Sequence, residues 1–262
     1  MGAYAGPTQT WGESNISDSA RIFASTKLVV QSGLVLNLDA GASTSYPGSG
    51  TTWTDLSGNN VIGDLTNGPT YSSSNGGFLS FDGTNDFVSV SSGIPERTNQ
   101  FTNEIWVYPT SISGGQNGWS TLIRMYGSRV GGGSGDFYFL LNSNGGVTHS
   151  EINQAGTGYN QWSTSNGIIS TNNWYHIVQV IDRTLPNVKF YVNNVLRLNL
   201  TVNNYGVTTN SSIQIAQQGT DPSNTFARRL KGRVSNVKLY NRVLTADEIQ
   251  QNFNATRSRF SI

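Results

Sequence analysis

The stretch that decides the fold is residues 78–90, which read F-L-S-F-D-G-T-N-D-F-V-S-V. Two short segments within it, 78–81 and 87–90, alternate apolar and polar residues, which is the period of a half-buried strand. Between them, Gly83 can adopt the positive φ of a tight connection, and the neighbouring Asp and Asn side chains offer oxygen atoms. The stretch therefore predicts a hairpin that holds two strands of a β-sandwich and gathers oxygen ligands at its turn.

Length and composition favour one large β domain and exclude several partners. The chain has 262 residues, 30 glycines, no cysteine, 12% charged residues and a formal net charge of +1. So small a charge gives no general attraction to nucleic acid, and no run approaches the roughly 20 apolar residues of a membrane span. The first residues carry no charged segment followed by an apolar one, so we expect no signal peptide. Together with the lack of cysteine, this favours a cytoplasm as the place of synthesis.

Beyond the opening stretch, the pattern is one of many short strands and a single helix. The helix is predicted near the end of the chain, where Thr245 and Glu248 form a capping box and Leu244 and Ile249 can form a hydrophobic staple. This pattern predicts an all-β fold, an antiparallel β-sandwich with one short C-terminal helix. We divide the chain into an N-terminal arm or docking segment, residues 1–32, and a sandwich domain, residues 33–262. Strands are expected around residues 33–40, 101–110, 122–126, 137–141, 173–182, 187–192, 212–216 and 232–240.

Six motifs occur in an order that resembles laminin G-like domains, in the concanavalin A-like lectin and glucanase jelly roll. They are G-L-V-L-N-L-D-A-G, W-T-D-L-S-G-N-N, F-D-G-T-N-D-F-V, F-T-N-E-I-W-V-Y-P, N-W-Y-H-I-V and V-S-N-V-K-L-Y-N-R-V-L-T-A-D-E-I. The resemblance covers roughly residues 33–253 and implies a jelly roll. The size of the chain, its N-terminal arm and its ending are similar to those of structural proteins of tailed bacteriophages. That similarity implies a virion protein assembled in a bacterial cytoplasm.

Three aspartates, Asp55, Asp82 and Asp86, are the candidate metal ligands. The family resemblance implies Ca²⁺ at such loops, and Ca²⁺ takes six to eight oxygen ligands. Where the family often has an acidic pair before the last strand, this chain has Ser235 and Asn236. The alternative is that the three aspartates only cap turns.

The sequence favours a non-enzymatic protein. Glucanases of this fold use closely spaced carboxylates, because retaining hydrolysis needs an acid and a nucleophile about 5 Å apart. Glu104 stands alone on its predicted strand, and Glu151 has no acidic neighbour two residues on. His176 lies in a strand beside apolar residues, and His149 has no evident relay partner, so neither predicts a catalytic triad.

Sugar binding would need exposed aromatic rings beside polar groups, since sugar rings stack on aromatic faces. Trp119, Tyr159 and Trp162 lie in polar, glycine-rich segments and are the candidate ligand-binding residues. The alternative for each is ordinary packing.

These observations predict a virion structural protein, displayed on the particle surface as a capsid decoration protein, with weak adhesion to surface glycans. Its partners would be capsid or other virion proteins, and a homo-oligomer is compatible with that role. One alternative is a carbohydrate-binding lectin module of a phage fibre or a bacterial surface protein. The other is a glycoside hydrolase.

Overall fold

The computed structural model describes residues 28–94, 99–112, 118–129, 136–152, 158–202, 208–218 and 228–262. Most of the predicted N-terminal arm, residues 1–27, lies outside these ranges, so the boundary at residue 32 stays a prediction. Within the last part of the arm, Val30 is buried, and its N–H donates to Asn252 Oδ1 at 2.8 Å. The described end of the arm therefore docks onto the C-terminal part of the domain.

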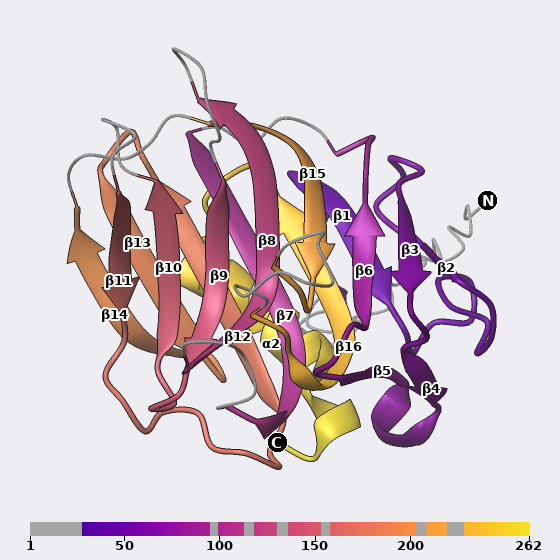
Figure 1. The fold of residues 1–262 in the computed structure, drawn as a ribbon. Coiled ribbons are helices and arrows are strands. Elements are labelled where there is room, and N and C mark those ends of the chain that lie inside the picture. The colour runs from indigo at the N-terminus through magenta and orange to yellow at the C-terminus, as the bar shows by residue number, and fades with distance from the viewer. Residues whose placement is uncertain are drawn as a thin grey trace, which may run out of the picture.

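Two antiparallel sheets form the sandwich, as the sequence predicts (Figure 1). In spatial order, sheet A contains β14 (Val195–Thr201), β13 (Asn187–Val192), β12 (Tyr175–Asp182), β7 (Gln100–Ser111), β16 (Lys231–Tyr240), β5 (Phe78–Asp82) and β4 (Thr70–Ser72), with β1 (Leu34–Asp39) paired to β16. Sheet B contains β11 (Tyr159–Ser163), β10 (Val147–Ile152), β9 (Phe137–Asn142), β8 (Trp119–Arg129), β15 (Thr208–Ile215), β6 (Phe87–Val90), β3 (Ile62–Thr66) and β2 (Thr52–Thr54).

The stretch at residues 78–90 is not a hairpin, and this corrects the sequence-based expectation. Its first half, β5, pairs with β4 and β16 in sheet A, whereas its second half, β6, pairs with β3 and β15 in sheet B. The connection is thus a corner between the sheets. Gly83 has a φ of +78° there, and Asp82 Oδ1 accepts from the N–H groups of Thr84 and Asn85. Alternation identified both strands correctly, but it cannot tell whether two strands share a sheet.

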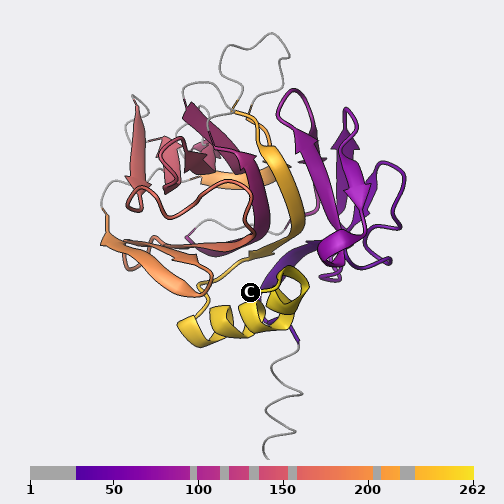
Figure 2. The same ribbon diagram turned by 90° about the horizontal axis from the view of Figure 1, so that it is seen from below.

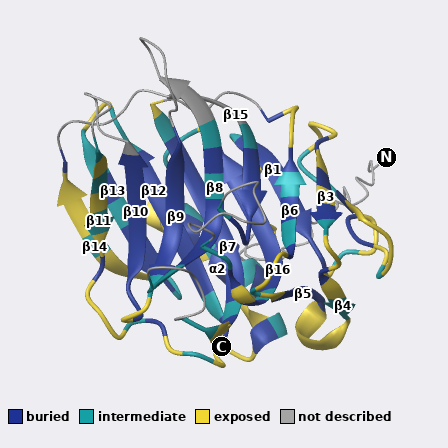
Figure 3. Cartoon of the chain, in the orientation of Figure 1, coloured by how far each residue is buried: buried dark blue, intermediate teal, exposed yellow. Residues whose placement is uncertain are grey.

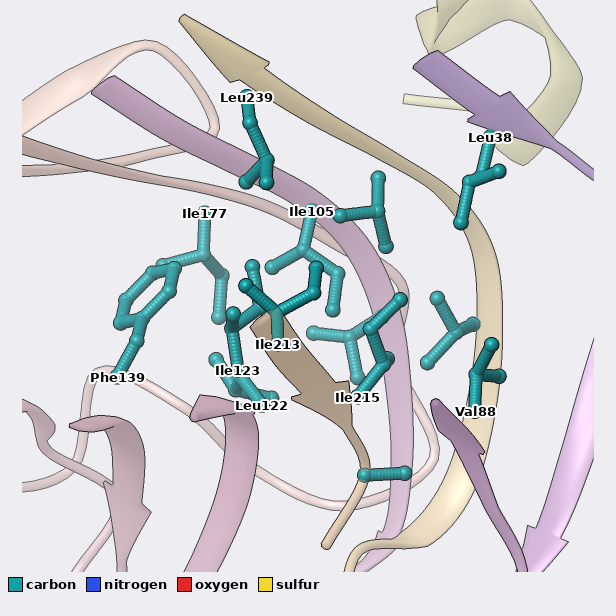
Figure 4. Packing of buried hydrophobic residues seen from close by; sticks show 14 of the residues in the cluster. Leu38, Val88, Ile105, Leu122, Ile123, Phe139, Ile177, Ile213, Ile215 and Leu239 are labelled. Atoms are coloured by element: carbon teal, nitrogen blue, oxygen red, sulfur yellow. The ribbon is translucent and has the colours of Figure 1, made fainter. Parts of the chain in front are cut away.

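The main core lies between the sheets and follows from this alternation (Figure 4). Ile105 and Ile177 point inward from sheet A and meet Ile123, Phe139 and Ile213 of sheet B. All five side chains are essentially inaccessible to solvent. Figure 3 shows that burial is concentrated in the central strands, while β14, at the edge of sheet A, is mostly exposed.

The helix α2 (Ala246–Thr256) covers the outer face of sheet A (Figure 2). Its capping box is confirmed, because the side chain of Thr245 accepts from the Glu248 N–H and the Glu248 carboxylate accepts from the Thr245 N–H. A short 3₁₀ turn, η3 (Arg257–Phe260), continues it, and another, η1 (Ser74–Gly76), follows β4. No helix in the described ranges has the length and apolar character needed to cross a membrane.

Candidate functional site

The three predicted metal ligands occupy two separate turns. Asp55 accepts from the N–H groups of Asn37 and Ser57 and from the Ser57 hydroxyl. Asp86 accepts from the Asp82 N–H at the corner between β5 and β6. In the described ranges, no three His, Cys, Asp or Glu side chains gather to hold a metal ion. The three aspartates thus do not fit one shared site, and Ca²⁺ binding by the corner alone stays a prediction.

The local environment shifts the pKa values of the two carboxylates at that corner, Asp82 and Asp86, in opposite directions. Burial raises the pKa of Asp82, but hydrogen bonds from Thr84, Asn85 and Asp86 outweigh it, so the pKa lies below its usual value. The pKa of Asp86 is raised, chiefly by burial and also by the nearby charge of Asp82. These are the bonds and shifts of a capped turn.

Glu104 lies in a buried polar cluster beneath α2, as far from solvent as the core. Its Oε1 accepts from Asn252 Nδ2 at 2.8 Å, and its Oε2 lies 3.6 Å from His176 Nε2. Lys238 is buried beside it, and burial lowers the pKa of its amine although Glu104 and Asp39 raise it. Glu104 and His176 are therefore enclosed by the fold and cannot reach a substrate.

Glu151 belongs to a second buried network, which lies between the sheets. Arg183 Nη2 donates to Glu151 Oε2 at 2.7 Å, and His149 Nε2 lies 3.3 Å from the same oxygen. From His149 the network continues to Gln179 at 3.0 Å and then to Asn103 at 2.6 Å. Burial raises the pKa of Glu151, but the contacts with His149 and Arg183 lower it by a larger amount. The pKa of the carboxylate is therefore below its usual value. The network stabilises a charge inside the core.

The two glutamates cannot act as a hydrolytic pair. Glu104 lies on the helix-covered face of sheet A, whereas Glu151 lies on the opposite side of that sheet, between the two layers. A retaining pair needs both carboxyl groups about 5 Å apart around one bond of the substrate. The fold separates these two and buries both.

The predicted aromatic residues divide between two sides of sheet B. Trp162 lies opposite His149 in the pairing of β10 with β11, packs against the main core and stacks on the His149 ring at 5.5 Å. Tyr159 is 55% exposed and Trp119 is half-buried. Trp162 thus closes the edge of the core, while Trp119 and Tyr159 share the outer face of sheet B with groups that the sequence did not single out.

The outer face of sheet B carries a continuous row of polar side chains across its strands. Strand pairing aligns the row residue by residue from β2 to β11. Its members are, in spatial order, Thr52, Asp64, Ser89, Gln214, Arg124, Tyr138, Ser150 and Gln161. The described helices pack on sheet A, so none of them covers this row (Figure 2). Thr52, Asp64 and Gln161 of this row are exposed, and Ser89 and Arg124 are half-buried, whereas Gln214, Tyr138 and Ser150 are buried. Part of the row is therefore open to solvent on sheet B, where sheet A is covered by a helix.

Arg124 organises the centre of this face. Its Nη2 donates to Asp136 Oδ2 at 2.5 Å, and its Nη1 donates to Tyr126 Oη at 2.6 Å. The guanidinium carbon lies 3.8 Å from the Tyr126 ring centroid and 5.6 Å from that of Tyr138. The Tyr126 hydroxyl in turn donates to Gln214 Oε1 at 2.6 Å. Burial lowers the pKa of Arg124, but the ion pair with Asp136 raises it by a larger amount. The net pKa is therefore raised, and the guanidinium group stays charged.

A second arginine, Arg228, extends the face beside Trp119. Its guanidinium carbon lies 5.6 Å from the Trp119 ring centroid. Its backbone carbonyl accepts from the Thr121 N–H, which fixes this part of the chain on β8. Tyr159 lies 6.0 Å from Tyr138 between ring centroids. We call this set the aromatic–arginine face; its members are Trp119, Arg124, Tyr126, Tyr138, Tyr159 and Arg228.

An open hollow of about 270 Å³ lies on the same side of sheet B, next to Tyr126. Ser89, Ser91, Ser212 and Gln214 contribute hydroxyl and amide groups to its lining, and Tyr126 and Ile213 contribute apolar surface. A hollow of this kind, next to a partly exposed tyrosine ring, offers both a stacking surface and hydrogen-bond partners.

Sequence reasoning missed most of this face because it looked for exposed aromatics in loops. The signal lay in the strands, where polar or aromatic residues alternate with core residues. Arg124 and Tyr126 alternate with Ile123 and Met125, and Tyr138 lies between two buried phenylalanines. Alternation could have identified the outward side chains, but not which outer face the helix would cover.

The chain belongs to the concanavalin A-like lectin/glucanases superfamily, because the model of that family matches residues 82–250, which is more than half of the chain. A comparison with curated protein sequences returned no match.

Solved structures confirm the fold at low sequence identity. The botulinum neurotoxin type G receptor-binding domain is 15% identical with a TM-score of 0.62, over 85% of this chain and 51% of that one. The binding domain of Paraclostridial mosquitocidal protein 1 is 18% identical with a TM-score of 0.63, over 85% and 52%. Trypanosoma rangeli sialidase in complex with sialic acid is 18% identical with a TM-score of 0.59, over 88% and 34%. This chain thus spans about half of each toxin domain and about a third of the sialidase, and shares with them a lectin-like sandwich.

Proposed function

We propose that this domain is a non-enzymatic carbohydrate-recognition module and that sugars bind to the outer face of sheet B. The observation that carries the proposal is the row of polar side chains, combined with the aromatic–arginine face, on a sheet that no described helix covers. Tyr159 and Tyr126 offer ring faces for stacking, and the row offers amide and hydroxyl groups for sugar hydroxyls.

Two further observations support recognition without chemistry. The buried glutamates lie on opposite sides of sheet A, each held by its own partners. Two of the similar structures are, by their names, receptor-binding or binding domains of toxins, which fits a module used for attachment.

The experiment is a binding screen of the purified protein on an array of immobilised oligosaccharides. We expect a restricted set of glycans to bind, and Tyr126→Ala to reduce that binding. Leu185→Ala is the matched control, because Leu185 is exposed on a turn of sheet A, between β12 and β13. Binding to no glycan, or equal loss with both variants, would contradict the proposal.

The setting that we propose for this module, on the sequence resemblance alone, is the surface of a bacteriophage particle. There it would be a capsid decoration protein that displays the outer face of sheet B. Electron cryomicroscopy of purified particles tests this setting: regularly placed copies on the shell would support it. Copies only at fibre tips, or none on the particle, would contradict it and leave the lectin-module alternative.

A further inference from the structure

Arg228 is partly buried and forms no ion pair with a described residue, a state that it shares with Arg229, which donates to Gln217, and with Arg233, which lies over two aromatic rings. Of these three, only Arg228 has a buried Nε without an acceptor in the described ranges. Arg124 pairs with Asp136, Arg183 with Glu151, Arg242 with Glu248 and Arg259 with Asp39. Within the described ranges, the Arg228 guanidinium forms no ion pair, and its Nε is enclosed without a hydrogen-bond acceptor. A half-buried cation left in this state is costly, because its hydration is reduced and no counter-charge replaces it.

The surroundings of Arg228 hold it at the surface. Its backbone is bonded to β8, and Trp119 lies against its guanidinium group. The titratable groups that act on it are the phenols of Tyr138 and Tyr159. Burial lowers the pKa of Arg228, and these phenols offset it only in part. Arg228 is partly exposed to solvent, although its Nε atom is buried. The solvent-accessible surface of Arg228 therefore belongs to its other atoms.

The charge of the whole face points the same way. Asp136 is neutralised by Arg124, so the six members of the aromatic–arginine face together with Asp136 carry two guanidinium groups and one carboxylate. A ligand that balances the charge of this face carries one negative charge. A planar carboxylate fits, because two N–H groups of one guanidinium can bind its two oxygen atoms together. An aromatic ring beside it supplies a surface for the sugar.

Resting on the proposed function, we propose that the module recognises an acidic sugar and that Arg228 binds the sugar carboxylate. A uronic acid and a sialic acid both present this group, and the two sources are separated by the probes. The sugar ring would lie near Trp119 and Tyr159, with the carboxylate toward the Nη atoms of Arg228.

The test compares matched ligands that differ in the carboxylate. One pair is trigalacturonate and its carboxyl-reduced form; the other is sialyllactose and lactose. We expect the wild-type protein to bind the acidic member of one pair at least about tenfold more tightly than its neutral counterpart, since hydrogen bonds to a charged group are stronger than those between neutral groups. The pair that shows the difference identifies the source of the carboxylate.

Variants then assign the effect to Arg228. Arg228→Gln should remove the preference, so that the acidic and the neutral member of the pair bind equally. Arg229→Gln removes the same charge one residue away, at a side chain that already donates to Gln217, and should leave most of the preference intact. Arg228→Lys should keep only part of the preference, because an ammonium group lacks the planar fork.

The outcomes separate the two proposals. Equal binding of acidic and neutral members, or a preference that survives Arg228→Gln, would overturn the role of Arg228 while sugar binding stands. Equal loss with Arg228→Gln and Arg229→Gln would show a general charge effect and would also overturn it. Failure to bind any member of the array or either ligand pair would overturn both proposals.

Discussion

The two outer faces of the sandwich use similar side chains but are completed differently. On sheet A, Glu104 and Trp106 lie beneath α2. There Asn252 Nδ2 donates to the Glu104 carboxylate, and Thr256 Oγ1 accepts from the Trp106 indole N–H. On sheet B, Arg228 has no acceptor or carboxylate within the described ranges. Polar and aromatic side chains on a sheet therefore stabilise the fold where the chain itself covers them. On sheet B, the side chains that stay exposed, such as Tyr159, are available to a ligand.

The largest expected loss of stability comes from the interior that both faces enclose. Glu151→Gln removes the charged carboxylate that Arg183 and His149 contact inside the core, and we expect the free energy of unfolding to fall by about 3–5 kcal/mol in urea titrations. Asp64→Asn, on an exposed carboxylate, is the control and should change it by less than about 0.5 kcal/mol.

The same variant has a defined pH signature. The pKa of Glu151 is depressed below its usual 4.5, so its contribution to stability is present above that value and is lost as the pH falls through the folded-state pKa. Below pH 4.5 we therefore expect stability to fall more steeply for the wild type than for Glu151→Gln. Parallel profiles would contradict the placement of Glu151 in the network.

The covered face is tested by Asn252→Ala. This change removes the donor to Glu104 and to the Tyr240 hydroxyl, and the acceptor for the Val30 N–H. Because the partners remain buried, we expect a loss of about 2–3 kcal/mol, measured by urea unfolding. Gln250→Ala, on the exposed side of α2, should be neutral, and glycan binding by the folded variant should be unchanged. A loss of binding with full stability would contradict the division between the two faces.

A smaller effect is expected at the start of α2. Thr245→Ala removes the side-chain acceptor for the Glu248 N–H and should cost about 1 kcal/mol in thermal or urea unfolding. Thr245→Ser keeps the acceptor and should cost much less. Equal loss with both variants would show that the methyl group, and not the cap, is what matters.

The smallest change in stability is expected on the open face. Tyr159 is 55% exposed, so Tyr159→Ala should alter the free energy of unfolding by less than about 0.5 kcal/mol. Its affinity for an array-selected glycan should nevertheless fall by roughly threefold to tenfold, because a stacking surface is lost. Calorimetric titration measures the glycan affinity of the wild type and of the variant. An unchanged affinity would show that Tyr159 is not part of the binding site.

Local patterns predicted the fold well because they report on side chains next to each other in sequence. The capping box at Thr245 and the strand expected at residues 101–110 were both confirmed. The hairpin at residues 78–90 was wrong, because its two strands pair in different sheets, β5 with β4 and β16 in sheet A and β6 with β3 and β15 in sheet B. No local pattern contains that information.

The site was harder to predict than the fold, for a related reason. Trp119, Tyr159 and Trp162 are chemically alike in sequence, yet strand pairing turns Trp162 toward His149 and the core. Arg228 carries no distinguishing signal in the sequence, and its place beside Trp119 depends on where β8 passes. The choice between packing and recognition is thus made by tertiary contacts.

The most direct test of the central claim is a crystal structure of the protein with an array-selected oligosaccharide bound. We predict that the sugar lies on the outer face of sheet B, with a ring against Tyr126, Tyr159 or Trp119 and its hydroxyls bonded to the polar row. Sugar bound instead at the edge strand β14, or beside α2 on sheet A, would contradict the assignment of recognition to sheet B.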